Sequence, residues 1–350
     1  MNEIIQVGII GAGGISTQHL NALQKEPRAH VKAIADISLE LAIEQAQNFQ
    51  IPQIYGDHRE MLSREQLDFV IICTPNHLHG PIAIDALKAG MHVLTEKPMT
   101  MNLDWALKMK EIADAQNKIL MVAQNNRFHA ETVHLRRLID EGRLGTIYHA
   151  KAAWIRRNGI PGWGNWFTVK ELSGGGSLID IGVHMLDLAM WLMHFPEPVS
   201  VLGKTYNIFG LERKKVAHWA KVNEKGEFNV EDLAIAMIQF ADGSSLVVDS
   251  SWASHTKEER AYVKLYGKDG GAEFDMLHKK TMIYTDENDL SVDIELRPTP
   301  QDERLLAVGN MVDAILGKAE PICKLEESIA VQKILDAIYQ SAESGELIKF

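Results

Sequence analysis

Apolar runs and amphipathic segments alternate through the first 125 residues of the chain. Runs rich in β-branched residues predict strands at 4–10, 30–35, 69–73, 92–95 and 119–122. The amphipathic segments between them predict helices at 15–25, 39–49, 81–89 and 103–116, with Ser38 as the N-cap of the second. Continuous apolar strands separated by helices imply a parallel sheet covered on both faces. Because such crossovers are right-handed, we expect a doubly wound α/β fold.

The pattern changes after residue 125. Strands are predicted at 146–156, 199–206, 232–240, 245–253 and 261–266, with few helices between them. Asp242-Gly243 is a hairpin signal between two of these runs. The chain closes with predicted helices at 303–316 and 325–341. We therefore expect one domain at 1–125 and a second at 126–350 with an antiparallel or mixed sheet, whose C-terminal helices can pack back on the first domain.

Composition narrows the function classes. Of the 350 residues, 36 are Lys or Arg and 47 are Asp or Glu, so the net charge is -11, which argues against nucleic-acid binding through a basic field. No run approaches the roughly 20 apolar residues of a membrane helix, so no membrane partner and a cytosolic location are expected. The two cysteines, Cys73 and Cys323, do not suggest a disulfide framework, and Cys73 lies in an apolar run typical of a buried thiol.

A glycine-rich turn, Gly11-Ala12-Gly13-Gly14-Ile15-Ser16, lies between the first predicted strand and helix. In this context Gly11 permits a tight turn, and Gly13 lets the backbone approach a pyrophosphate at the helix N-terminus. Asp36 ends the second strand, where a carboxylate accepts hydrogen bonds from ribose hydroxyls and repels a 2′-phosphate. NAD is therefore favoured over NADP, with dual use left open. The expected cofactor contacts here are Gly11, Gly13, Gly14, Ile15 and Asp36.

Polar residues also follow the third and fourth strands, at the edge where ligands of such sheets bind. After the third strand come Thr74, Pro75, Asn76 and His77, all candidates for cofactor contact. His77 and His79 have a spacing that metal sites use, but no third ligand is adjacent, so turn or capping roles are favoured and no metal is expected. Glu96-Lys97-Pro98 comes after the fourth strand. The Lys97 ammonium can donate to a substrate hydroxyl or a developing alkoxide.

A second candidate site follows three glycines, Gly174 to Gly176. Asp180 and His184 stand four residues apart, which on a helix places a carboxylate and an imidazole on one face. Histidine is the usual general base near neutral pH. Taken alone, such a pair is more often a capping or packing pair, and the cofactor motif together with Lys97 favours the catalytic interpretation.

The combination of GAGGIS, Asp36, TPNHLH, GMHVLTEKP and GGGSLIDIGVHMLD resembles the Gfo/Idh/MocA oxidoreductases, which include inositol dehydrogenases and glucose-fructose oxidoreductase. The resemblance implies an N-terminal Rossmann domain and a C-terminal α/β domain with a large, open, mainly antiparallel sheet. In relatives this sheet commonly serves subunit association, which implies a homodimer or homotetramer.

The resemblance also implies roles for individual residues. Lys97 would hydrogen-bond the reacting hydroxyl, His184 would be the general acid/base, and Asp180 would bind the substrate or orient the imidazole. Glu96, Lys97 and Asn125 are placed near the cofactor, and Arg127 near the substrate.

The segment from Trp154 to Trp166 is the candidate for substrate selection. Arg156, Trp163 and Trp166 can read hydroxyls and stack on a sugar ring, while a packed loop remains an equal alternative. The sequence thus predicts NAD-dependent oxidation of a secondary alcohol of a sugar, glycoside or inositol to a ketone or lactone. Two alternatives stay open: redox-neutral, NAD-assisted glycoside cleavage or epimerisation, and a non-catalytic NAD-sensing protein.

Overall fold

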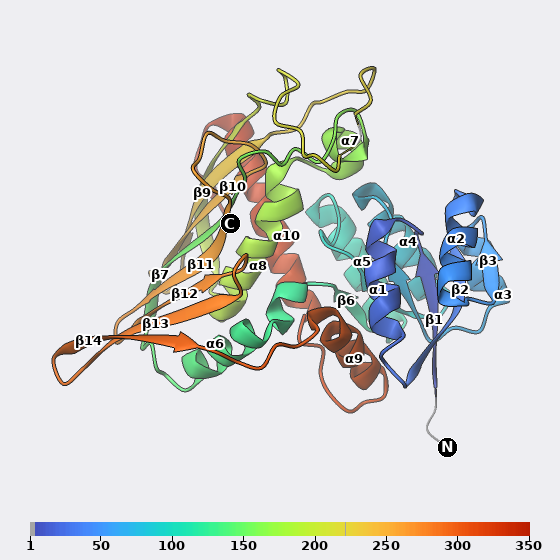
Figure 1. The fold of residues 1–350 in the computed structure, drawn as a ribbon, viewed down its shortest axis with the longest axis horizontal. Coiled ribbons are helices and arrows are strands. Elements are labelled where there is room, and N and C mark those ends of the chain that lie inside the picture. Colours follow the sequence, from blue (N-terminus) through green and yellow to red (C-terminus); the bar gives the residue numbers. More distant parts are fainter. Residues whose placement is uncertain (1–3, 221) are drawn as a thin grey trace. The chain divides into compact units, whose positions relative to one another are not determined.

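The computed structural model describes residues 4–220 and 222–350, which form two compact units. Unit 1 extends to Phe128 and includes Gln301–Ile329, while unit 2 comprises His129–Pro300 and Ala330–Phe350. The chain therefore returns to unit 1 for a short stretch before it ends in unit 2. Figure 1 draws the elements of both units and labels them along the chain.

Unit 1 contains a six-stranded sheet of order β3-β2-β1-β4-β5-β6, in which every neighbouring pair is parallel. This is the strand order of the Rossmann fold, so the doubly wound prediction is confirmed. The strands are β1 (Ile5–Ile10), β2 (Ala29–Ala35), β3 (Gln53–Tyr55), β4 (Phe69–Ile72), β5 (His92–Thr95) and β6 (Leu120–Val122).

Apolar cores cover both faces of this sheet. Alternate strand residues enter different cores, with Ile9 and Ile71 in one and Ile10 and Ile72 in the other. Helices α1, α2 and α9 contribute to the first core, and α3, α4 and α5 to the second. The helical elements are α1 (Gly14–Leu23), α2 (Leu39–Phe49), α3 (His58–Arg64), α4 (Asn76–Lys88), α5 (Leu103–Ala115), the 3-10 turn η1 (Asn125–Phe128) and α9 (Glu303–Ile315).

One local prediction in unit 1 is wrong, and a second is confirmed in position only. Helix α4 begins at Asn76 rather than at Pro81, with Pro75 at its N-cap position and Pro81 inside the helix. Ser38 occupies the predicted N-cap position of α2, although its side chain makes no capping hydrogen bond. Its backbone N–H instead donates to Asp36 Oδ1 at 2.7 Å, so the cap position is set by the acid at the end of β2.

Unit 2 is built on a nine-stranded sheet of order β14-β13-β12-β11-β7-β10-β9-β8-β15. Its β7–β10 pair is parallel, and the predicted hairpin at Asp242-Gly243 joins the antiparallel strands β9 and β10. The large, mainly antiparallel sheet is therefore confirmed. The strands are β7 (Ile147–Ile155), β8 (Pro198–Tyr206), β9 (Leu233–Phe240), β10 (Ser245–Ser251), β11 (Arg260–Gly267), β12 (Gly271–Asp275), β13 (Lys280–Glu287), β14 (Leu290–Leu296) and β15 (Ile348–Lys349).

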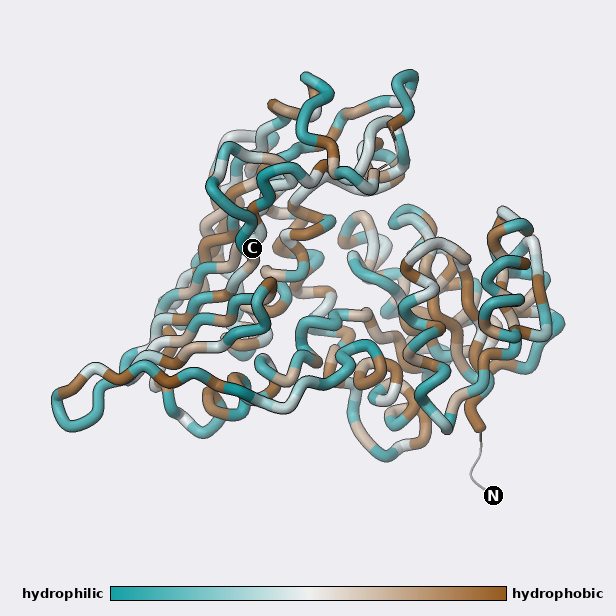
Figure 2. Tube along the Cα trace, in the orientation of Figure 1, coloured by the Kyte–Doolittle hydropathy of each residue, from teal (hydrophilic) through white to brown (hydrophobic). Residues whose placement is uncertain are grey.

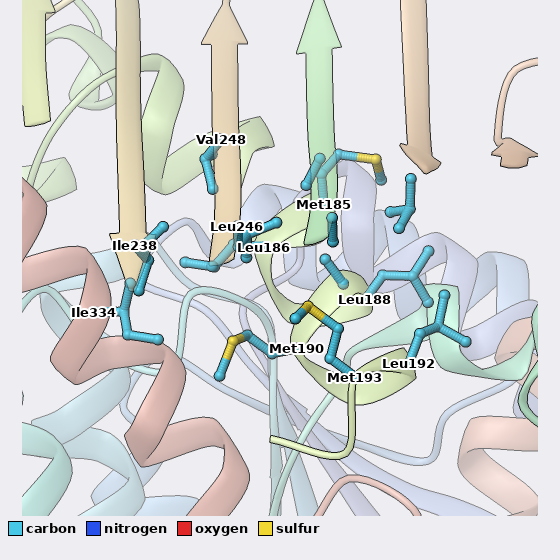
Figure 3. Close-up of a cluster of buried hydrophobic side chains, with 14 of the residues drawn as sticks. Met185, Leu186, Leu188, Met190, Leu192, Met193, Ile238, Leu246, Val248 and Ile334 are labelled. Atoms are coloured by element: carbon cyan, nitrogen blue, oxygen red, sulfur yellow. The ribbon is translucent and has the colours of Figure 1, made fainter. Parts of the chain in front are cut away.

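Helices cover one face of this sheet. Helix α8 packs Met185, Leu186 and Leu188 into the same core as Leu246 and Val248 of β10 (Figure 3). Figure 1 shows α6, α8 and α10 on this side of the strands. The helical elements are α6 (Ala130–Asp140), η2 (Trp166–Thr168), α7 (Lys170–Ser173), the π turn η3 (Leu178–Gly182), α8 (Val183–Leu192) and α10 (Leu325–Ser344), of which residues up to Ile329 are assigned to unit 1.

The opposite face of the nine-stranded sheet keeps apolar side chains at its surface. Leu202 pairs with Met237 across β8 and β9, and Ile235 lies two residues away on the same face. All three side chains are exposed. Figure 2 shows that apolar and polar residues both occur along these strands. Among the residues described, no helix combines the length and hydropathy needed to cross a bilayer.

Candidate active site

The glycine turn of unit 1 has the geometry that a dinucleotide site needs. Gly11 has a φ of 99°, and a Cβ there would lie 2.7 Å from the backbone carbonyl of Cys73, so a side chain is excluded. At Gly13 and Gly14 a Cβ would meet nothing within 4 Å, so the backbone is open where α1 begins. Ser16 stands at the third position of the glycine motif, where a small residue is needed. It is buried, and its hydroxyl donates to the Gly13 carbonyl at 2.6 Å.

Asp36 holds this turn against the end of β2. Its Oδ2 accepts the Ala12 N–H at 2.6 Å, and its Oδ1 accepts the Ser38 N–H at 2.7 Å. A carboxylate offers about four lone-pair sites, so both oxygens can still accept hydrogen bonds from ribose hydroxyls. The acid therefore organises the glycine turn and remains suited to a ribose.

Buried polar atoms at the carboxyl ends of the strands fit a bound cofactor. Thr74 Oγ1, after β4, and Asn125 Oδ1, after β6, are buried and have no hydrogen-bond partner in the described part of the chain. Because unpaired buried polar atoms are costly, a ligand that reaches them is the natural partner. The neighbouring candidates Pro75, Asn76 and His77 form the N-cap and first positions of α4. This edge of unit 1 therefore fits a dinucleotide.

His79 joins the two loops at this edge. It is buried, with Nδ1 2.8 Å from the Pro98 carbonyl oxygen and Nε2 2.9 Å from that of Thr74. Burial lowers the pKa of the imidazole, and the two carbonyl oxygens offset only part of this effect. No cluster of three metal-ligating side chains occurs within residues 4–220 and 222–350. His79 packs between the loops that carry Thr74 and Pro98, where a neutral imidazole can donate to one of the two carbonyl oxygens.

Glu96 faces the interior of unit 1. Its Oε1 lies 2.7 Å from His19 Nε2 and accepts from Arg304 at 3.1 Å, and its Oε2 accepts the Lys97 N–H at 3.2 Å. Burial raises the pKa of the Glu96 carboxyl, but the His19 hydrogen bond and the nearby positive charges outweigh it and hold the pKa far below its usual range. Glu96 is therefore ionised and holds the backbone of the half-buried Lys97. Contact between Glu96 and the cofactor stays a prediction.

In unit 2, Asp180 and His184 lie on an otherwise buried segment. Between residues 175 and 193, every residue except Asp180, His184 and Trp191 is buried. Asp180 belongs to the π turn η3 and His184 to the start of α8, so the two residues lie on consecutive helical turns of different type. Single π turns within helices are frequent at functional sites. The Asp180 carboxylate and the His184 imidazole are thus held by a well-packed, buried segment.

Two tryptophans contact this pair. Trp252, fully buried just after β10, donates its Nε1 hydrogen to Asp180 Oδ2 at 2.9 Å. The ring of Trp154, at the end of β7, lies 5.8 Å from the His184 ring. Since β7 and β10 form the parallel pair, both indoles come from the same end of adjacent strands. Sequence reasoning missed Trp252, which lies inside the strand predicted at 245–253 and belongs to no motif.

The segment predicted to select the substrate is largely occupied by internal contacts. The Arg156 guanidinium lies 4.7 Å from the Trp154 ring and 3.1 Å from Glu259, which also accepts from Trp154 Nε1 at 2.8 Å. Trp163 is 4% exposed and stacks on Phe228, in a small core that favours the packed-loop alternative for this residue. Trp166 stacks on the adjacent Phe167 at 3.8 Å. Substrate contact by these three predicted residues stays a prediction.

Arg127 is fully buried within unit 1. Its guanidinium pairs with Glu327 and donates to the Ile322 carbonyl at 3.2 Å. These contacts join η1 to the chain that follows α9, and a role of Arg127 in substrate binding stays a prediction.

Cys73 and Cys323 are both free, buried thiols, as expected for Cys73.

The parallel sheet, the glycine turn and Asp36 define an NAD-binding oxidoreductase. Residues 5–124 match the family described as an oxidoreductase family with an NAD-binding Rossmann fold, and residues 132–273 match the GFO/IDH/MocA C-terminal domain. The chain belongs to this Gfo/Idh/MocA family.

Relatives agree with this assignment. D-glucoside 3-dehydrogenase of Escherichia coli K12 is 33% identical over 97% of this chain and 96% of its own. Levoglucosan dehydrogenase of Pseudarthrobacter phenanthrenivorans is 27% identical over 77% of this chain and 73% of its own. A solved apo structure of a levoglucosan dehydrogenase is 25% identical, covers 99% of this chain and 98% of its own, and has a TM-score of 0.88.

Proposed function

We propose that the chain oxidises a secondary alcohol of a cyclic sugar, glycoside or inositol to a ketone or lactone, with NAD+ as hydride acceptor. The observation that carries the proposal is the partly exposed Asp180 and His184 pair on a segment in which only these two residues and Trp191 are not buried. The resemblance over nearly the whole chain to D-glucoside 3-dehydrogenase supports a sugar substrate. It also favours a glucoside oxidised at C3 as the first substrate to test.

The residues then have distinct roles. His184 removes the proton of the reacting hydroxyl, a step typically worth about 10²–10⁴-fold in rate. Asp180, fixed by Trp252, binds the substrate or orients the imidazole. Lys97 donates to the oxygen as negative charge develops on it. The nicotinamide of bound NAD+ would supply the hydride acceptor.

Cofactor contact belongs to the edge of the parallel sheet in unit 1. The open backbone at Gly13 and Gly14 would receive the pyrophosphate, and Asp36 would accept from the ribose. Thr74 and Asn125 would donate to or accept from the cofactor through their buried side chains. Ile15 and the residues Pro75 to His77 complete this set of proposed contacts.

The test is cofactor reduction with a panel of methyl glucosides, levoglucosan, myo-inositol, free hexoses and open-chain polyols, with NAD+ and NADP+ assayed separately. The proposal predicts net NADH formation with cyclic substrates and a preference for NAD+. Cleavage of a glycoside without NADH release would contradict net oxidation and favour redox-neutral catalysis. Tight NAD binding without turnover on any substrate would favour a sensing protein.

The proposal includes self-association. The exposed apolar residues Leu202, Ile235 and Met237 lie on the face of the nine-stranded sheet opposite its helices. A homodimer or homotetramer would bury such a face. Light scattering of the wild type and of Met237→Lys tests this, because the charged variant should dissociate, and a monomeric wild type would contradict it.

A further inference from the structure

Glu231 is a buried acid just before β9, and it contacts the glycine segment that precedes Asp180. Its Oε2 accepts the Gly176 N–H at 2.8 Å, and its Oε1 accepts the Leu178 N–H at 2.9 Å. Its backbone carbonyl accepts the Ser177 N–H at 3.1 Å. Three consecutive backbone N–H groups are thus tied to one residue.

Tyr339 of α10 completes this arrangement. Its hydroxyl donates to Glu231 Oε1 at 3.0 Å. The carboxylate therefore receives three hydrogen bonds, from Gly176, Leu178 and Tyr339. Burial raises the pKa of Glu231, while these bonds favour the charged form and offset part of that effect. All three partners are donors, so both carboxyl oxygens of Glu231 act as acceptors and tie the glycine segment to Tyr339.

The same two residues account for two of the three glycines. A Cβ at Gly176 would lie 1.8 Å from the Glu231 carbonyl oxygen, and one at Gly175 would lie 2.1 Å from the Tyr339 hydroxyl. Any side chain at either position would displace these partners. The glycines therefore let the backbone approach an acid and a phenol of the same unit.

The anchored residues lead directly into the turn that carries Asp180. The Asp180 N–H donates to the Gly176 carbonyl at 3.1 Å, so the first turn begins at a residue that Glu231 holds. His184 follows one turn later, at the start of α8. Displacement of the glycine segment would shift Asp180 and His184 together.

We propose that Glu231, held by Tyr339, is a positioning residue that fixes the glycine segment and thereby aligns Asp180 and His184 with the reacting hydroxyl. This inference rests on the proposed function, because it assumes that His184 acts on the substrate. Neither Glu231 nor Tyr339 touches the reacting atoms. Their effect is on alignment, to which turnover is sensitive at the ångström scale.

The experiment compares Glu231→Gln and Tyr339→Phe with the wild type. A glutamine amide presents N–H groups to backbone N–H groups, so one hydrogen bond of the anchor becomes a repulsion. We expect Glu231→Gln to lower kcat by roughly 10–100-fold, in line with small misplacements of catalytic groups. Tyr339→Phe should lower kcat less, and the KM for NAD+ should not change in either variant. Hydrogen exchange of the 174–184 backbone should accelerate in both.

The controls separate this inference from the proposed function. Glu224→Gln removes an exposed acid from the same connection between β8 and β9, and it should behave as wild type. His184→Gln shows whether the imidazole acts at all, and undiminished turnover there would contradict the proposed function. A folded Glu231→Gln with faster exchange but wild-type kcat would overturn the positioning role. If Glu231→Gln does not fold, wild-type kcat in Tyr339→Phe would overturn it.

Discussion

The Trp252 indole nitrogen donates a 2.9 Å hydrogen bond to Asp180 Oδ2. Trp252 is fully buried in a small core that includes Ile181, the residue next to Asp180. The indole therefore cannot reorient without disturbing the turn itself. Because the carboxylate is held before any substrate binds, its orientation costs little at the moment of reaction.

Trp252→Phe removes this donor and keeps an aromatic ring in the core. We expect kcat/KM for the sugar to fall about ten-fold, which corresponds to roughly 1.4 kcal/mol, within the usual net contribution of one intramolecular hydrogen bond. The affinity for NAD+ should not change. Trp219→Phe, at an exposed tryptophan of the same unit, is the matched control. An unaltered kcat/KM in a folded Trp252→Phe would show that Asp180 needs no such support.

Asp36 should set the cofactor preference. Asp36→Ser keeps a small hydrogen-bonding group at the end of β2 and removes the charge that repels a 2′-phosphate. We expect kcat/KM to fall with NAD+ and to rise with NADP+. Glu40→Gln, which neutralises an exposed acid in the first turn of α2, should leave the preference unchanged. A preference that survives Asp36→Ser would place the discrimination elsewhere.

The buried Glu96 carboxylate should make stability depend on pH in one direction. Its pKa is lowered by His19, Arg304 and Lys97 in spite of burial, so the unfolded chain binds the proton more tightly. The stabilisation is therefore complete above the ordinary carboxyl pKa near 4.5 and is lost as the pH falls through the lower folded value. Urea unfolding of the wild type and Glu96→Gln from pH 8 to pH 3 measures this difference. If the stability advantage of the wild type over Glu96→Gln grew as the pH fell, the lowered pKa of Glu96 would be contradicted.

Two adjacent acids on α10 offer a matched test of burial. Glu327→Gln removes the carboxylate that pairs with the fully buried Arg127 guanidinium, which we expect to cost roughly 3–5 kcal/mol of unfolding free energy. Glu326→Gln breaks only the exposed pair with Lys110, worth about 0–1 kcal/mol. Equal losses of unfolding free energy in the two variants, measured by urea unfolding, would show that the Arg127–Glu327 pair does not stabilise the fold more than an exposed pair.

Local patterns were sufficient to predict the parallel sheet and its glycine turn. The apolar runs of β1 and β4 and the position of Asp36 all lie within short stretches of sequence. The strand β3 and the helix α3 were missed, because β3 has only three residues and two of them are exposed. Short, exposed elements carry little periodic signal.

The supports of the candidate site could not be predicted in the same way. Glu231 contacts Gly176 across 55 residues, and Trp252 contacts Asp180 across 72 residues. Neither pair forms a spacing motif, so the fold alone brings them together. The glycines before Asp180 were a visible signal of close approach, but the sequence did not say what approaches them.

The measurement that tests the central claim most directly is the fate of the hydrogen on the reacting carbon. The best cyclic substrate of the panel, deuterated at that carbon, is oxidised with NAD+ by the wild type and by His184→Gln. The account predicts that deuterium appears in NADH, and that His184→Gln slows its transfer by about 10²-fold or more. Product formation without deuterium in NADH, or an undiminished rate in His184→Gln, would contradict it.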